Sequence, residues 1–224
     1  MIQHTITIYF DIICAWSYIG HRTLFQAIAL FQKTYPGARH DEFHLAFRPY
    51  YRDRSLPAVP VPLEQRLDSF LGPDAAGDIK TRVVRIGRNH GINFTFDSKI
   101  GSTRSAHRLI YAVGLSKGSE AQRALIEMLY FRWCEVGADI TSYSFLAECA
   151  EAAAGFSASD ALAALEEGRY GEEVDRLDAR GREDGVSCVP TFDINGVRVE
   201  GAEDTATFYE LFVKHKEEDG EKES

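Results

Sequence analysis

The chain has 224 residues, of which 45% are hydrophobic and 26% charged, and 34 acidic against 25 basic residues give a net charge of −9. These values suit one soluble domain of generous size, or one domain that carries an insertion. The acidic balance argues against nucleic acid or a membrane surface as a partner, since both are anionic, and no stretch approaches the ~18 apolar residues of a membrane span.

The cysteines and the N-terminus predict a reducing compartment. Cys14, Cys134, Cys149 and Cys188 are widely scattered and none forms a CxxC pair, which is unlike a disulfide-stapled secreted scaffold. The first residues enter a strand pattern at once and show no secretory signal. We therefore expect a cytoplasmic protein, with Cys134 and Cys149 buried on apolar helix faces. No histidine pair carries the glutamate of an HExxH motif, so no metal site is predicted.

The first fifty residues predict a βαβ unit. Residues 4–10 read as a strand, a helix follows over about 15–34 and ends before Tyr35-Pro36-Gly37, and a second strand runs from Glu42 to Tyr50. The strand assignments rest on alternation of apolar and polar residues, and the helix on apolar residues at helical spacing.

The middle of the chain predicts helices. Pro57, Pro60 and Pro62 mark a break. Amphipathic runs separated by glycines then extend from Leu63 to about Asp184.

Strand patterns return near the C-terminus. Residues 191–194 and 197–200 flank Asn195-Gly196, a dipeptide that supplies the positive φ angles of a two-residue hairpin turn. A last helix is predicted from Asp204 to about His215, and the charged segment 216–224 is predicted to be a disordered tail.

The order βαβ, helical insertion, ββα resembles a thioredoxin fold, and the insertion resembles that of the DsbA-like superfamily, more closely its FrnE-like branch. Kappa-class glutathione transferases and 2-hydroxychromene-2-carboxylate isomerases are near relatives of that branch. The resemblance spans roughly residues 4–213 and implies an α/β protein with a thioredoxin-like domain over 1–58 and 185–215 and an inserted helical domain over 59–184. Five segments carry it: Phe10–Gly20, Ser105–Leu109, Glu135–Ile140, Asp184–Phe192 and Glu200–Glu203.

Cys14 stands where the first strand ends and the first helix begins. The unpaired N–H groups and positive macrodipole end of a helix start favour a thiolate, so this position predicts a pKa below the free value of roughly 8.5. Cys14 is the candidate nucleophile, and Ser17 is a candidate hydrogen-bond donor to its sulfur. Trp16 either shields the thiolate and contacts substrate or simply packs.

The motif departs from both groups of relatives. Redox members carry a second cysteine at the position of Ser17 and commonly a proline at that of Ala15, whereas the transferase and isomerase relatives carry serine at that of Cys14. A serine hydroxyl cannot resolve a mixed disulfide, because it is far too weakly acidic to exchange. An outside thiol, or Cys188, would have to do so.

The resemblance also implies the remaining site residues. Pro190 would be cis and would leave the backbone of Val189 free to pair with an extended peptide or glutathione. Cys188 is either a displaced resolving thiol or a small buried residue. His107 and Arg104 lie in a segment whose family counterpart faces the active site. His107 either binds substrate or is a helix histidine with its hydrogen bonds made within the protein. Arg104 either binds an anionic ligand at the helix N-terminus or forms part of the helix start.

Three functions fit these residues. The first is monothiol disulfide exchange through Cys14, with glutathione as cosubstrate and a disulfide-bearing peptide or small molecule as partner. The second is a glutathione-dependent transferase or isomerase acting on a small organic molecule. The third is a thioredoxin-fold binding protein without redox activity. The sequence leaves open whether the chain forms a homodimer.

Overall fold

The computed structural model describes residues 1–222 and contains a four-stranded sheet in the order β2-β1-β5-β6. β1 (Gln3–Phe10) is parallel to β2 (Glu42–Pro49) and antiparallel to β5 (Thr191–Ile194), which pairs with β6 (Val197–Glu200). Alternate residues of β1 are buried, as the alternation predicts. The predicted α/β fold, with a βαβ and a ββα half, is confirmed.

The hairpin between β5 and β6 turns as its sequence predicts. Asn195 and Gly196 have φ angles of 53° and 83°. The Asn195 side chain also accepts a hydrogen bond from the Thr5 N–H at 2.9 Å. The turn is therefore tied to the central strand.

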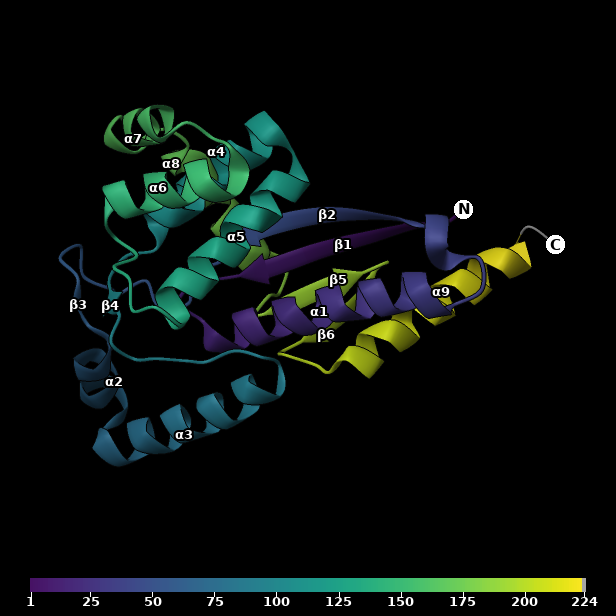
Figure 1. Cartoon of the computed structure of the whole chain (residues 1–224), viewed down its shortest axis with the longest axis horizontal. Helices are drawn as coiled ribbons and strands as arrows, with labels where there is room; N and C mark the ends of the chain where they lie inside the picture. The colour runs from purple at the N-terminus through teal and green to yellow at the C-terminus, as the bar shows by residue number, and fades with distance from the viewer. Residues whose placement is uncertain (223–224) are drawn as a thin grey trace.

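Helices α1 (Ala15–Thr34) and α9 (Thr205–Lys222) lie side by side against one face of the sheet (Figure 1). A 3-10 turn, η1 (Ala38–His40), leads from α1 to β2. The segment predicted to be a disordered tail from residue 216 is helical as far as Lys222. Lys216 pairs with the buried Asp41 carboxylate and donates to the Gly37 carbonyl at 3.1 Å, and this long-range anchor cannot be read from local composition. Residues 223–224 lie outside the described residues.

The insertion lies at the end of the molecule opposite both termini, where β1 ends (Figure 1). Two short strands, β3 (Val61–Pro62) and β4 (Lys99–Ile100), pair within it and were not predicted, because two residues carry no periodicity. Its helices are α2 (Leu63–Leu71), α3 (Pro73–Asn89), α4 (Arg104–Lys117), α5 (Ser119–Cys134), α6 (Tyr143–Ala154), α7 (Ala158–Glu166) and α8 (Gly171–Glu183).

The inserted helices and the sheet share one cluster of buried side chains. Tyr130 of α5 is fully buried and stacks on Tyr18 of α1, with ring centroids 4.9 Å apart and planes 10° from parallel. Phe10, the last residue of β1, meets the same tyrosine edge-on. The insertion is thus packed directly against the start of α1.

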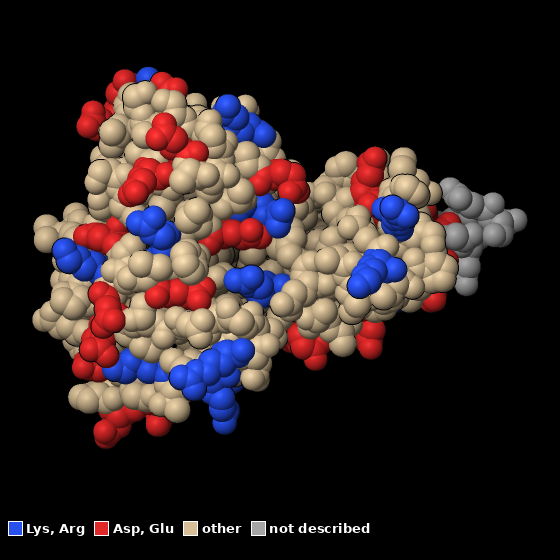
Figure 2. All heavy atoms as spheres, viewed as in Figure 1, with Lys and Arg blue, Asp and Glu red and all other residues tan. Residues whose placement is uncertain are grey.

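On the face shown in Figure 2, acidic and basic side chains are intermingled. Within residues 1–222, every helix is too short or too polar to cross a bilayer.

Candidate active site

The helix α1 begins beside Cys14 at the carboxyl end of β1, as predicted. Cys14 is the N-cap residue with φ −97° and ψ 108°, and its carbonyl accepts the Tyr18 N–H at 3.2 Å. Its thiol donates to the carbonyl oxygen of Val189 at 3.3 Å. The Val189–Pro190 bond is cis, and the Val189 N–H has no hydrogen-bond partner among residues 1–222. The loop before β5 therefore lies against the sulfur.

Burial controls the ionisation of this thiol. Cys14 is 2% exposed. Desolvation raises its pKa above the usual value, while the positive charge of Arg52 and hydrogen bonding from Ser17 lower it and the Asp11 carboxylate raises it further. The prediction of a lowered pKa was wrong for this conformation, because it considered the helix start without the loss of water. Cys14 belongs to a small buried cluster with Tyr50, Val186 and Val189, against which Tyr9 and Trp16 pack.

Asp11 and His107 form a buried pair beneath the motif. The Asp11 carboxylate lies 3.2 Å from His107 Nε2 and accepts the Arg52 N–H at 2.9 Å. The carbonyl of Asp11 accepts the Cys14 N–H at 3.1 Å. His107 therefore orders the turn that presents Cys14, and its own side chain, 1% exposed, does not line the cavity at the thiol.

A cavity of about 310 Å³ opens beside Cys14, between the start of α1 and the inserted helices. Trp16 lines it, and the guanidinium of Arg82 lies over the Trp16 ring at 5.2 Å from the centroid. Arg66 is paired with Asp53 at 2.6 Å, whereas the exposed Arg52 guanidinium has no ion-pair partner in the described part of the chain. Most of the wall is apolar: Ile13, Leu63, Leu67, Phe70, Leu71, Ile79, Val83, Phe94, Phe96, Ile100 and Trp133.

Arg104 lies away from this cavity. Its guanidinium binds Asp175 of α8 through Nε at 2.9 and 3.0 Å and through Nη2 at 2.8 Å. The Asp175 carboxylate also accepts the Tyr51 hydroxyl at 2.8 Å. The side chain therefore joins α4 to α8 and is occupied by a carboxylate.

The other cysteines differ from one another in exposure. Cys188 is exposed, so the interpretation as a small buried residue was wrong, and its sulfur lies 3.9 Å from the Thr191 hydroxyl. Cys134 and Cys149 are buried as predicted. Cys134, the last residue of α5, also lines the cavity at Cys14, a position that its apolar helix face alone did not indicate. All four thiols are free.

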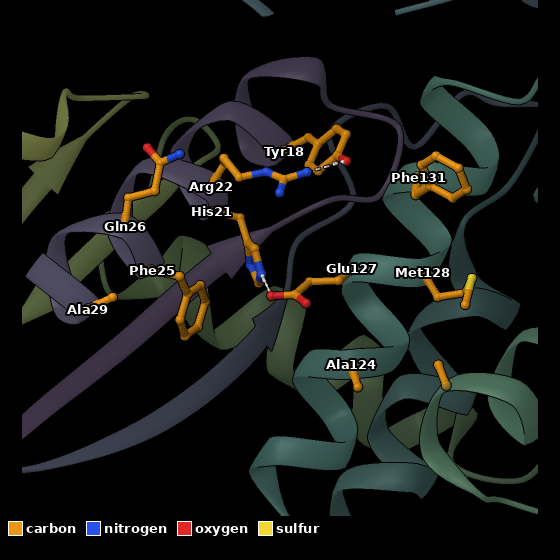
Figure 3. A pocket seen from close by; sticks show the side chains of 11 residues that line it. Tyr18, His21, Arg22, Phe25, Gln26, Ala29, Ala124, Glu127, Met128 and Phe131 are labelled. Atoms are coloured by element: carbon orange, nitrogen blue, oxygen red, sulfur yellow. Dashed lines mark hydrogen bonds and ion pairs between the residues drawn. The ribbon is translucent and has the colours of Figure 1, made fainter. Parts of the chain in front are cut away.

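A second hollow of about 650 Å³ opens between α1 and α5 (Figure 3). His21 and Glu127 face each other there at 3.1 Å, and Arg22 donates to the Tyr18 hydroxyl at 3.1 Å. No cysteine is among the described residues that line it. His21, Glu127, Arg22 and Tyr18 are paired with neighbours there, so the cavity at Cys14 is the candidate active site. Within residues 1–222, His, Cys, Asp and Glu side chains form no group of three that could hold a metal ion.

The model of the DSBA-like thioredoxin domain matches residues 5–213. The chain belongs to this family. A comparison with curated proteins gave no match.

Solved structures of DSBA-like and related proteins share the fold. A probable DsbA oxidoreductase from Streptomyces coelicolor is 22% identical with a TM-score of 0.79, covering 94% of this chain and 89% of its own. A 2-hydroxychromene-2-carboxylate isomerase is 17% identical with a TM-score of 0.69, covering 98% and 100%. The cytosolic disulfide reductase DsbM from Pseudomonas aeruginosa, solved with GSH, is 15% identical with a TM-score of 0.64, covering 95% and 99%. At these identities the likeness establishes the fold.

Several residues at the site were not identified from the sequence. Asp11 lies inside the motif but reads as a strand break, and Arg52 follows the second strand without any pattern of its own. Tyr130 sits on an apolar helix face like any core residue. The contacts of these three residues join segments far apart in the chain, so no local pattern indicates them. For Asp11 the sequence offered one signal, its place three residues before Cys14.

Proposed function

We propose that this DSBA-like protein is a thiol-disulfide oxidoreductase that works through the single thiol of Cys14. The observation that carries the proposal is the position of Cys14, at a helix start, against the Val189 carbonyl and beside a cavity. The Cys14 thiolate attacks a disulfide, forms a mixed disulfide and releases one thiolate. A second thiolate then attacks the substrate-derived sulfur, forms a new disulfide and returns Cys14 as thiolate.

We propose glutathione as the outside thiol. Ser17 cannot displace the mixed disulfide, and the free N–H of Val189 offers a backbone donor to an extended peptide such as glutathione. The unpaired Arg52 guanidinium at the cavity suits a carboxylate. The structural neighbour DsbM was solved with GSH, and the cytoplasm, the location we propose, supplies this thiol.

The apolar wall of the cavity supports a second candidate, a glutathione transferase or isomerase. Such an enzyme would bind an apolar electrophile beside the thiol, and Cys14 or Ser17 would hold the glutathione thiolate instead of exchanging disulfides. The two candidates differ in their need for Cys14. Disulfide exchange requires its sulfur, whereas a held thiolate needs only a hydrogen-bond donor, which serine provides.

The test is reaction of the reduced protein with oxidised glutathione, followed by peptide mapping without reductant. Because Cys188 is exposed, a Cys188→Ser background removes a second accessible thiol that lies outside the motif. We expect one glutathione adduct, on Cys14, that reduced glutathione releases. In the same background Cys14→Ser should abolish reduction of the mixed disulfide of glutathione and 2-mercaptoethanol.

Other outcomes separate the alternatives. If Cys14 takes no adduct while glutathione still binds in a calorimetric titration, the transferase or isomerase is favoured. If neither occurs, the chain is a binding protein without redox activity. A Cys14–Cys188 or Cys14–Cys134 disulfide in the unsubstituted protein would contradict the need for an outside thiol.

A further inference from the structure

Two buried hydroxyl groups near the Cys14 sulfur have no hydrogen-bond partner. They are Ser17 Oγ, in a residue 1% exposed, and the phenol oxygen of Tyr130, in a residue 0% exposed. A buried polar group without a partner costs free energy, and native proteins contain few of them. Both occur within the packing of the first turn of α1, which calls for a chemical reason.

Both residues lie at the first turn of α1, close to Cys14. Ser17 is in the first turn of α1, which Cys14 caps. Ser17 lowers the pKa of Cys14 through its hydroxyl and its backbone N–H, although the hydroxyl makes no hydrogen bond of normal geometry while Cys14 is a thiol. Tyr130 stacks on Tyr18, the residue after Ser17, and the Ser17 hydroxyl in turn lowers the pKa of Tyr130 against the larger effect of burial.

We propose that Ser17 and Tyr130 form a chain of donors that stabilises the Cys14 thiolate. On ionisation the thiol proton leaves the Val189 carbonyl for a solvent base. The Ser17 O–H then donates to the sulfur, and the Tyr130 O–H donates to Ser17 Oγ. The inference rests on the proposed function, in that Cys14 reacts as a thiolate. It gives Ser17 a direct contact with the reacting atom and makes Tyr130 a positioning residue.

The chemistry of each group fits this order. In the thiol form the proton of Cys14 satisfies Val189 O, and neither hydroxyl is needed. In the thiolate form the sulfur becomes a strong acceptor in a dry environment, where a donor counts for more than in water. Burial and the nearby thiolate both raise the pKa of Tyr130, so its phenol stays protonated and remains a donor.

The backbone N–H of Ser17 also lowers the pKa of Cys14, and the two hydroxyls add to its effect. Arg52 favours the thiolate, but its side chain is exposed and water screens its charge. Asp11 disfavours the thiolate and is held by His107. Among residues 1–222, the remaining titratable or charged groups around the sulfur and its cavity are Tyr9, Tyr50, Asp53, Arg66, Cys134, Arg82 over the Trp16 ring and Arg182 over the Tyr50 ring.

The test measures the pKa of Cys14 in the free protein. The rate of alkylation by iodoacetamide is followed against pH, and mass spectrometry of the peptide that contains Cys14 separates it from the other thiols. We expect Tyr130→Phe to raise this pKa by about one unit, a tenfold loss of thiolate at a fixed pH below it. Ser17→Ala should raise it at least as much.

Two controls distinguish a donor from a structural role. Tyr18→Phe removes a buried hydroxyl from the stacked partner, but that hydroxyl donates to Glu135 at 2.7 Å, so the pKa of Cys14 should not change. Tyr130→Phe removes an unpaired hydroxyl, so stability in urea should be unchanged or higher. A higher thiol pKa without loss of stability supports the donor chain.

The double variant tests the order of the chain. In a Ser17→Ala background, Tyr130→Phe should have no further effect on the pKa. An unchanged pKa in both single variants, or equal and additive shifts, overturns the proposal. Because no disulfide or glutathione enters this measurement, such a result is independent of the adduct on Cys14, whose absence would overturn the proposed function instead.

Discussion

Arg108 is a buried cation held entirely by main-chain carbonyls, and we predict that Arg108→Ala is strongly destabilising. The residue is 4% exposed. Its Nη2 donates to the carbonyls of Ala164 and Leu165 at 2.8 and 2.9 Å, and its Nε donates to that of Arg169 at 2.8 Å. The guanidinium therefore binds the C-terminal end of α7, where the macrodipole is negative and where the Ala164 and Leu165 carbonyls also accept the N–H groups of Arg169 and Gly168.

The magnitude follows from these three bonds. Each hydrogen bond to a charged group contributes roughly 1.5–3 kcal/mol, and their effects are not additive. Loss of the guanidinium also leaves the Arg169 carbonyl without its buried donor. We expect the free energy of unfolding to fall by about 3–5 kcal/mol, as for other broken buried networks.

The assay is urea denaturation with Arg104→Ala as matched control. Arg104 lies one turn earlier on α4, and its side chain and that of Asp175 are 42% and 46% exposed. Such a surface pair contributes at most about 1 kcal/mol. Equal losses for the two variants would refute the reasoning, because burial and carbonyl binding would then make no difference.

Three further predictions concern the motif, its packing and pH. Ser17→Cys should form a disulfide with Cys14 on oxidation, detectable by peptide mapping; a stable dithiol would show that the two positions are not placed as in the redox relatives. Gly20→Ala would place a methyl group 3.0 Å from ring carbons of Pro190 and of Phe192 in β5, so the free energy of unfolding in urea should fall by about 1–3 kcal/mol. In the control Gly77→Ala, the new methyl group on α3 meets open space, and the free energy of unfolding should rise by up to about 1 kcal/mol. Burial lowers the pKa of His4 from 6.5 to about 4, so the folded state favours the neutral ring. The stability that His4 contributes is therefore present above pH 6.5 and is lost as the pH falls towards 4, by up to about 3 kcal/mol. His4→Gln should make the free energy of unfolding depend less on pH in this window.

Periodicity and turn chemistry are local, and they predicted most of the fold. The alternation in β1, the helical spacing in α1 and the Asn195-Gly196 turn each depend on neighbours within a few residues, and all appear where predicted. The helices of the insertion were predicted for the same reason. The pair β3 and β4 and the end of α9 were missed, because each depends on a partner far away in the chain.

At the candidate site, too, some features follow from local sequence and others from long-range contacts. The sequence by itself determined where the candidate nucleophile Cys14 stands and that Ser17 cannot resolve a disulfide, since both follow from residue type and position in the motif. Only the tertiary structure decided that burial, and not the helix start, dominates the ionisation of Cys14. It also decided that Arg104 and His107 bind carboxylates outside the cavity and that two buried hydroxyls at the first turn of α1 are unpaired. Desolvation and hydrogen-bond satisfaction are set by groups from distant segments, so no local pattern records them.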